Sequence, residues 1–340
     1  MRVAIYPGAG LPITVEHVPD PEPSREDLLL KIGRCGICGS DPSMTSGSAF
    51  DYPAGCRLGH EYSGEVVAIG KDVTGFKVGD RVACLPQIGC GACQTCLNGR
   101  PFYCSAIRFL SGGFADFIAI PHQTAVRLPQ SLSLADGALV EPIACGLRAL
   151  RLADMRGGEN LLVLGAGSMA LAVVYWARQL GARAVTVASR SSKKRDTMLT
   201  FGADRFHSFA EDDPAALDRA GPWDIVAECA GKPGLLNKAI EYVRPTGTVI
   251  SLGMCMQPEP IVPAFCAFKE VRLHFPVAYS VNEFVATARA FESGRIRPEL
   301  VVDKVIGLDD VPRVIASMRA GTGAQKIQVD PSMEAVHADA

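Results

Sequence analysis

The segment that most constrains the fold is "NLLVLGAGSMALAVVYWARQLGARAVTVAS", residues 160–189. It runs from a short apolar stretch through a glycine-rich turn into a helix-length apolar segment, and a β-branched stretch follows. This order is typical of a strand, a crossover helix and a parallel strand. Parallel strands are buried on both faces by such helices, so the segment predicts an α/β domain with a doubly wound parallel sheet.

The glycine-rich turn in this unit is a candidate dinucleotide site. Gly165 would make the tight turn, Gly167 would let the backbone approach a pyrophosphate, and Ala170 would permit close helix packing. Ser168 and Met169 begin the helix, where free N–H groups and the positive end of the helix dipole favour an anion. Because the turn lies between a strand and a helix and a further strand follows, it predicts a Rossmann domain.

The end of the second strand bears on the choice of nucleotide. Ser189 stands where NAD-binding chains carry an acidic residue for the ribose hydroxyls. A carboxylate there would repel a 2′-phosphate, whereas hydroxyl and cationic groups would bind it through charge-assisted hydrogen bonds. The sequence therefore favours NADP(H) over NAD(H), with contacts from Ser189, Arg190, Ser191 and Lys194. In the alternative interpretation, Arg190 and residues 193–195 form only the solvated start of a helix.

Length and texture predict two domains, since 340 residues exceed the size at which one core usually keeps growing. Residues 1–146 contain short Val/Ile-rich stretches broken by Gly, Pro and Asp, which indicates an antiparallel β-rich domain. Residues 147–283 alternate strand-length and helix-length segments and hold the nucleotide-binding domain. A strand, a helix and a last strand are expected within residues 284–340, which would return to the first domain.

Charge and hydropathy exclude several classes of partner. Lys and Arg total 34 against 36 for Asp and Glu, so there is no electrostatic basis for binding nucleic acid or an anionic membrane. The N-terminal stretch lacks the apolar region of a signal peptide, and no run reaches the roughly 18 apolar residues of a membrane span. We therefore expect a soluble cytoplasmic protein, in which cysteines serve as metal ligands or buried thiols.

Four cysteines form a compact cluster in "CGACQTCLNGRPFYC". Their spacing is C-x2-C-x2-C-x7-C, with Gly and Asn at the turns: Cys90, Cys93, Cys96 and Cys104. Four thiolates complete a tetrahedral zinc shell and leave no position open for chemistry, so the cluster predicts a structural zinc site. The alternatives are an iron–sulfur cluster or a set of reduced thiols with no metal.

A second candidate metal site is dispersed along the chain. "CGICGSD" contributes Cys38, "GHEYSGEVVAIG" contributes His60 and Glu61, and "ALVEPIACGL" contributes Glu141. One thiolate, one imidazole and a carboxylate make three protein ligands, which leaves a fourth position for water or substrate, as in catalytic zinc sites. Taken singly, each residue has a plainer interpretation as a buried thiol or a structural polar side chain.

These motifs, in this order, resemble the zinc-dependent medium-chain alcohol dehydrogenase family over essentially the whole chain. The resemblance is carried by "GICGSD" at 36–41, "GHE" at 59–61 with Gly64 and Gly70, "GDRV" at 79–82, the four-cysteine segment and "LGAGSMA" at 164–170. Glu141 followed by Pro142 is similar to the polyol branch, that of sorbitol, L-idonate and threonine dehydrogenases. The resemblance implies a β-rich GroES-like catalytic domain beside the Rossmann domain, and a small-molecule alcohol or ketone as substrate.

The resemblance also implies roles for individual residues. Cys38 and His60 would be zinc ligands, with either Glu141 or Glu61 as the third and Glu141 slightly favoured. Asp41 would fix the tautomer of His60, and Ser40 would take the proton of the bound alcohol. Zinc lowers the pKa of a bound hydroxyl to about 7, so the alcohol can lose its proton at neutral pH and its hydride to a nicotinamide. The chain would then hold two zinc ions, one catalytic and one structural.

One position departs from the family pattern. Many members have a histidine two residues after the Asp of this motif, which passes the proton to solvent; here "SDPSM" places Ser43 there. Direct release of the proton to water and a detour through Ser43 both remain open.

Two other functions compete with a dehydrogenase. A non-catalytic redox sensor could use the same zinc and nucleotide sites, but retention of Cys38, His60 and Glu141 disfavours it. A zinc-ribbon nucleic-acid module could use the four-cysteine cluster, but the balanced charge and the absence of a basic, aromatic-rich patch disfavour it.

Substrate and assembly follow only from the resemblance. It implies oxidation of a secondary alcohol, with a polyol, cyclitol or amino alcohol preferred. Residues 43–52 and the loop around Tyr279 are expected to line the pocket; if Met44, Phe50 and Phe114 line it, a more apolar cyclic alcohol is the alternative. A homodimer or homotetramer is implied, with "TGTVISLGM" at 246–254 as the candidate sheet edge for the interface.

Overall fold

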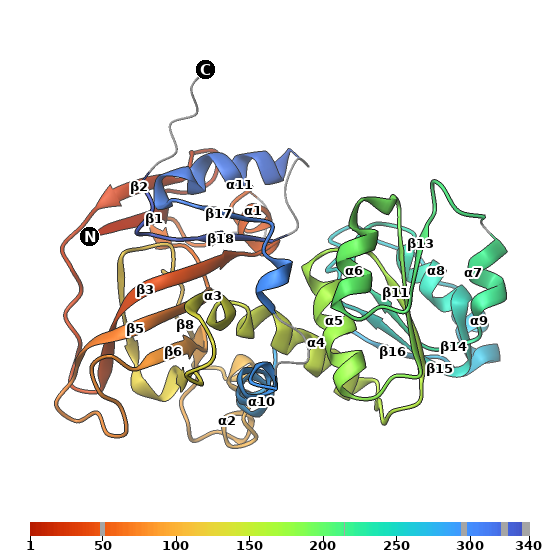
Figure 1. Ribbon diagram of the computed structural model, residues 1–340, viewed down its shortest axis with the longest axis horizontal. Coiled ribbons are helices and arrows are strands. Elements are labelled where there is room, and N and C mark those ends of the chain that lie inside the picture. The colour runs from red at the N-terminus through yellow and green to blue at the C-terminus, as the bar shows by residue number, and fades with distance from the viewer. Residues whose placement is uncertain (48–51, 214, 294–297, 321–325, 335–340) are drawn as a thin grey trace. The chain divides into compact units, whose positions relative to one another are not determined.

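The computed structural model describes residues 1–47, 52–213, 215–293, 298–320 and 326–334 of the chain (Figure 1). Two compact units are present: unit 1 comprises Met1–Glu141 with Ser280–Ala340, and unit 2 comprises Pro142–Tyr279. The boundaries were expected after residues 146 and 283. The first observed boundary, after Glu141, lies within helix α4 (Val140–Leu152). The change from short β-strand segments to alternating strand and helix segments in the sequence therefore does not mark this boundary.

Unit 1 is built mainly of short strands. They are β1 (Arg2–Tyr6), β2 (Thr14–His17), β3 (Asp27–Ile37), β4 (Cys56–Arg57), β5 (Glu61–Ile69), β6 (Arg81–Cys84), β7 (Gln87–Ile88), β8 (Arg108–Phe109), β9 (Phe117–Pro121), β10 (Ala125–Arg127), β17 (Lys304–Ile306) and β18 (Ile327–Val329). Its α-helices are α1 (Ser40–Ser43), α2 (Gln94–Leu97), α3 (Leu134–Gly137), α10 (Val281–Phe291) and α11 (Val311–Arg319). Its 3-10 helices are Pro101–Tyr103, His122–Thr124, Pro298–Val301 and Leu308–Asp310.

The long strand β3 organises the main sheet of unit 1. The described strands follow the order β10-β6-β5-β3-β18-β17, and β9 also pairs with β3. Leu28, Leu30 and Ile32 alternate along β3 into the core, as the two-residue period of a strand requires. On the other side of β3, the C-terminal strand β18 pairs with it antiparallel, so the blue end of the chain lies beside the red start in Figure 1.

Unit 2 alternates strands and helices. Its strands are β11 (Asn160–Leu164), β12 (Ala184–Ser189), β13 (Arg205–Ser208), β14 (Trp223–Glu228), β15 (Val243–Ser251) and β16 (Arg272–His274). Its helices, besides the 3-10 turn Ser192–Lys194, are α5 (Ser168–Gln179), α6 (Arg195–Phe201), α7 (Ala215–Ala220), α8 (Leu235–Tyr242) and α9 (Pro263–Lys269).

The sheet of unit 2 is parallel, in the order β13-β12-β11-β14-β15-β16. Its central strands are continuous apolar runs, and Ala170 to Ala177 of α5 are all buried, as expected for a helix that covers such a sheet. The strand order reverses between β11 and β14, where doubly wound sheets bind ligands at the carboxyl ends of their strands. The predicted α/β class and the Rossmann topology are thereby confirmed.

The expected interface edge at residues 246–254 is wrong. Most of this segment forms β15, which pairs with β14 on one side and β16 on the other. Its β-branched, buried residues are those of an interior strand. On this side of the sheet the described edge strand is β16, three residues long, and β13 is the edge on the other side. No helix in the described part of the chain is long and apolar enough to cross a bilayer.

Candidate metal and nucleotide sites

Strand pairing explains why Cys38 meets His60 and Glu61. The C-terminal end of β3 lies beside the start of β5, with Gly36 opposite Glu61 in the antiparallel register. Cys38 follows β3 directly, and His60 directly precedes β5. The local fold therefore places a thiol, an imidazole and a carboxylate at one end of the sheet.

The three side chains form a group that fits a metal ion. One ligand atom from each of Cys38, His60 and Glu61 lies within 4.8 Å of the others. Three buried atoms around this point have no hydrogen-bond partner among the described residues: Asp41 Oδ1, His60 Nδ1 and Glu61 Oε1. Buried polar atoms are rarely left in this state. A cation bound between these groups would engage the orphaned Glu61 oxygen, so the donor set and its environment fit zinc.

Asp41 links this site to the loop that follows β3. Its carboxylate is fully buried, and Oδ2 accepts a hydrogen bond from the Cys38 backbone N–H at 2.8 Å. Oδ1 lies 3.6 Å from His60 Nδ1. Burial disfavours the imidazolium, but Asp41 and then Cys38 outweigh that effect and raise the pKa of His60 well above its ordinary value. The site is thus a strongly electronegative one that attracts positive charge.

Lys326 is a member of this site that the sequence analysis missed. Its Nζ donates to Glu61 Oε2, and it also donates to the Ile37 carbonyl at 3.3 Å. The register of β18 against β3 pairs Ile327 with Ile37, which brings Lys326 level with Cys38. No motif marks a single lysine 265 residues from its partner in the chain, so only the strand pairing could have found it.

Glu141 and Ser40 each lie in the first turn of a helix. Glu141 is in the first turn of α4 and is not one of the three groups that lie within 4.8 Å. Its carboxylate nevertheless acts on Lys326, because it is among the charges that raise the pKa of that lysine. Ser40 is the half-buried first residue of α1, and Ser43, at the other end of α1, donates its hydroxyl to the Gly39 carbonyl at 3.0 Å.

The four cysteines converge as the spacing predicts. One sulfur from each of Cys90, Cys93, Cys96 and Cys104 lies within 4.8 Å of the others. Backbone N–H groups point at the sulfurs, with Cys93 N donating to Cys90 Sγ at 3.3 Å and Cys90 N donating to Cys104 Sγ at 3.3 Å. Hydrogen bonds to sulfur stabilise thiolate charge, so the segment is arranged to hold a cation.

A neighbouring hydroxyl lowers the pKa of one thiol of this cluster. The Thr95 hydroxyl lies 3.1 Å from Cys93 Sγ. This hydrogen bond, followed by contacts with Cys96, lowers the pKa of Cys93 to about 6. A thiolate that persists near neutral pH is the form that binds zinc.

The glycine-rich turn in unit 2 has the geometry of a phosphate cradle. Gly165 has a φ of +117°, and a Cβ there would lie 3.2 Å from Ala230. Gly167 precedes α5 in an extended conformation, and a Cβ there would meet nothing within 4 Å. Ser168 and Met169 are the first residues of this 12-residue helix, so their N–H groups lie at its positive end.

The far end of β12 carries the groups predicted for a 2′-phosphate. Ser189 ends the strand, Arg190 is exposed, and Ser191 precedes the 3-10 turn that contains Lys194. The charge of Arg195 is engaged elsewhere, because it donates to Asp212 at 3.1 Å. Glu211, which no motif indicated, accepts hydrogen bonds from the Ser192 N–H and hydroxyl at 3.2 and 2.7 Å.

The residues proposed to line the substrate pocket are only partly described. Phe50 lies outside the described residues, Met44 is half-buried, and burial raises the pKa of Tyr52 to about 12. Phe114 is fully enclosed in the core of unit 1, packed against the position of Gly59, so it does not line a pocket as expected. Tyr279 is also buried.

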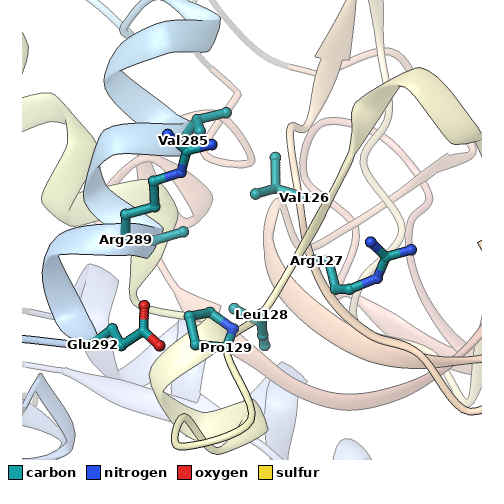
Figure 2. A pocket seen from close by; sticks show the side chains of 8 residues that line it. Val126, Arg127, Leu128, Pro129, Val285, Arg289 and Glu292 are labelled. Atoms are coloured by element: carbon teal, nitrogen blue, oxygen red, sulfur yellow. The ribbon is translucent and has the colours of Figure 1, made fainter. Parts of the chain in front are cut away.

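A groove elsewhere on unit 1 is separate from these sites. It has a volume of about 390 Å³ and lies between residues 126–129 and α10, where Val285, Arg289 and Glu292 face it (Figure 2). None of the predicted site residues lines it.

Comparison with known proteins agrees with both units. Residues 24–130 match the alcohol dehydrogenase GroES-like domain, and residues 168–293 match the zinc-binding dehydrogenase domain. The chain is 31% identical over 275 residues to sorbitol dehydrogenase of Bacillus subtilis, covering 77% of this chain and 78% of that protein. It is 34% identical over 242 residues to galactitol 1-phosphate 5-dehydrogenase of Escherichia coli, covering 68% and 69%.

A solved structure extends the likeness to the whole chain. A zinc-binding dehydrogenase of Sinorhizobium meliloti, crystallised bound to NADP, superposes with a TM-score of 0.89 at 30% identity and covers 97% of this chain and 99% of its own. Sequence relatives, strand topology and the metal-binding constellation agree. The chain therefore belongs to the zinc-dependent medium-chain alcohol dehydrogenases, among relatives that act as polyol dehydrogenases.

Proposed function

We propose that this dehydrogenase transfers a hydride between a secondary alcohol, that of a polyol, cyclitol or amino alcohol, and NADP(H), giving the ketone. The observation that carries the proposal is the convergence of Cys38, His60 and Glu61 within 4.8 Å, beside buried polar atoms that lack partners. A full set of four protein ligands would favour a structural metal; three leave a position for substrate oxygen.

The chain's own residues divide the work at this site. Cys38, His60 and one carboxylate, of Glu61 or Glu141, would hold zinc, which supplies Lewis acidity toward the substrate oxygen. Asp41 would orient the imidazole through Nδ1, since it faces that atom and is itself fixed by the Cys38 N–H. Ser40, at the start of α1, would accept the proton of the alcohol while it passes its own hydroxyl proton on, to water or to Ser43.

The four-cysteine cluster would hold a second, structural zinc. Its support is the meeting of four sulfurs and the N–H groups that point at them. Since all four coordination positions are taken by protein, this metal would stabilise the segment from β7 to β8 and take no part in turnover.

NADP(H) is proposed over NAD(H) because the strand end carries Ser189 and the exposed Arg190 in place of an acid. The NADP-bound relative from Sinorhizobium supports this choice. Polyol specificity is supported by the relatives that act on sorbitol and galactitol 1-phosphate.

We further propose a homodimer, or a tetramer built from such dimers, joined along β16. On α9, packed beside β15, Phe265 and Phe268 are 65% and 86% exposed, and Phe275, just after β16, is 65% exposed. Phenylalanines beside a sheet edge favour a covered surface. Phe268→Glu should shift the protein toward monomer in sedimentation velocity, whereas Phe109→Glu, an exposed phenylalanine of unit 1, should not. A monomeric wild type would contradict the proposal.

A cytoplasmic location is proposed from the thiols. None of the twelve cysteines, all of which lie within the described residues, forms a disulfide bond. Free thiols and thiolate metal sites persist in a reducing compartment.

The test is a set of initial rates with zinc-replete enzyme. Polyols, cyclitols, amino alcohols and apolar secondary alcohols are each offered with NADP+ and with NAD+. We expect turnover of vicinal-hydroxyl substrates with NADP+, and a Ser189→Asp variant that shifts preference toward NAD+. Activity confined to primary aliphatic alcohols, or an NAD+ preference in the wild type, would contradict the substrate or the cofactor assignment respectively.

A further inference from the structure

Lys326 is buried where a lysine is rarely found. Its side chain is 2% exposed and that of its partner Glu61 is 1% exposed. Buried lysines occur almost only where a negative group pairs with them, because an uncompensated charge would be strongly destabilising. The pair is not part of the hydrophobic core: it lies at the end of the sheet where the candidate zinc ligands meet.

The backbone leaves room for this pair. Gly36 lies opposite Glu61 in the strand register, and a Cβ at Gly36 would collide with Glu61 Oε2 and approach Lys326 Cε to 3.1 Å. Any larger residue at position 36 would therefore displace the pair. The Ile37 carbonyl accepts a second hydrogen bond from Lys326, which fixes the ammonium over β3.

The two oxygens of Glu61 have different surroundings. Oε2 is held by Lys326, whereas Oε1 is buried with no hydrogen-bond partner among the described residues. A free carboxylate can chelate a metal with both oxygens, but one held by an ammonium can offer only the other. Glu61 is thus presented with one oxygen available.

The contacts of Lys326 support a lasting pair. Both side chains are almost fully buried, and the ammonium donates to Glu61 Oε2 and to the Ile37 carbonyl. The ammonium therefore offsets part of the negative charge that Glu61 brings to the metal position.

We propose that Lys326 is a positioning residue that restrains Glu61 to at most one-oxygen contact with the catalytic metal, so that one coordination position stays open for substrate. This inference rests on the proposed zinc site and deepens it. Without Lys326, Glu61 would swing both oxygens onto the metal, and the substrate oxygen would have to displace one of them.

The test uses cobalt as the metal probe, because the visible absorption of Co2+ weakens when its coordination number rises above four. Each variant is loaded with Co2+, and the spectrum of Cys38→Ser, which keeps only the four-cysteine cluster, is subtracted. Lys326→Met should show a weaker catalytic-site band than the wild type and a kcat lower by about tenfold or more, as for other residues that orient metal ligands. KM for NADP+ should not change.

Three further variants serve as controls for this test. Lys304→Met removes an exposed lysine from the neighbouring strand β17 and should match the wild type in both readouts. In the double variant Lys326→Met/Glu61→Gln, neither member of the buried pair is left charged without its partner, and the amide offers the metal a single oxygen, so the wild-type band intensity should be recovered. If Lys326→Met does not fold, Lys326→Gln should show the same change to a smaller extent.

The outcomes separate this inference from the proposed function. A Lys326→Met enzyme with the wild-type cobalt band would overturn the role of Lys326, even if the wild type is an active dehydrogenase. A weakened band restored by the double variant would support it, even if the substrate panel shows no turnover. In that case only the proposed reaction would fail.

Discussion

Asp41 lies between the backbone of Cys38 and the imidazole ring of His60. One carboxylate oxygen accepts the Cys38 N–H at 2.8 Å, and the other faces the His60 ring at 3.6 Å. Asp41 is fully buried, so its carboxylate is shielded from water at both of these positions. The sequence motif predicted a role for this residue, and the structure places its carboxylate between the Cys38 backbone and the His60 ring. That Asp41 fixes the orientation of the imidazole stays a prediction.

Ser40 should be the hydroxyl that removes the proton from the alcohol. Ser40→Ala is expected to lower kcat by about a hundredfold or more, the usual contribution of a positioned proton acceptor. Zinc content should not change. Ser43→Ala is the matched control, since the Ser43 hydroxyl is bonded to the Gly39 carbonyl and should be dispensable. If kcat falls in Ser43→Ala and not in Ser40→Ala, the proton leaves by the other hydroxyl.

Thr95 should govern the acid sensitivity of the four-cysteine zinc. Its hydroxyl is the main cause of the lowered pKa of Cys93, about 6, so this thiolate resists protonation until the pH falls to that region. Thr95→Val would raise the pKa and move zinc release to higher pH, because protons and metal compete for the sulfur. Release to a chromogenic chelator, followed in the Cys38→Ser background, measures the midpoint. Thr95→Ser should behave as the wild type; equal midpoints for Thr95→Val and Thr95→Ser would refute this account.

Among the elements, β3 has the greatest effect on the candidate site. It pairs with β5, which begins at Glu61 directly after His60, and with β18, which begins directly after Lys326. The first pairing joins segments whose motifs resemble those of the dehydrogenase family, so the resemblance indicated that Cys38, His60 and Glu61 meet. The second joins segments nearly 300 residues apart along the chain, and no local pattern specifies which residue of β18 faces Cys38.

The same limit explains the misplaced interface edge. Residues 246–254 are apolar and β-branched, a pattern shared by interior strands and by edges covered in an oligomer. The decision between them depends on where the next strand adds, and β16 is too short to be recognised by its own alternation. Pairing of β15 with β14 on one side and β16 on the other shows its interior position.

Two glycines in the turn between β11 and α5 should affect different properties, Gly165 the stability of the fold and Gly167 the binding of the nucleotide. Gly165→Ala should lower the free energy of unfolding by about 1–3 kcal/mol, because alanine is strained at a φ of +117° and meets Ala230. Gly167→Ala should leave stability within about 0.5 kcal/mol, since its Cβ enters open space. That space is where the pyrophosphate is expected, so Gly167→Ala should weaken NADP+ binding about tenfold or more. Denaturant unfolding and fluorescence titration measure the two effects; unchanged binding in Gly167→Ala would place the pyrophosphate elsewhere.

At the scale of the whole molecule, the chain assigns separate tasks to separate units. Unit 1 holds both candidate metal sites, and unit 2 holds the glycine-rich turn and the strand end expected to bind the nucleotide. The sequence indicated this division, because short β-strand segments dominate the first part of the chain and alternating strand and helix segments the second. The four-cysteine motif and the glycine-rich turn each lie well inside one unit, whereas the Glu141–Pro142 motif spans the boundary. The sequence did not indicate that the boundary lies within α4, because the residues of this helix on either side of the boundary do not differ in composition.

Zinc analysis combined with turnover tests the central claim that this is a zinc-dependent dehydrogenase with one catalytic and one structural metal. Cys38→Ser should reduce the zinc content from two ions per chain to one, matching the two ligand groups, while the protein remains folded. Its kcat with NADP+ and the preferred alcohol should fall by at least about a thousandfold, the equivalent of several kcal/mol of lost charge stabilisation. Cys56→Ser, which removes a thiol outside both groups, should keep two zinc ions and full activity. A Cys38→Ser enzyme that retained two zinc ions, or turned over at the wild-type rate with one, would contradict the account.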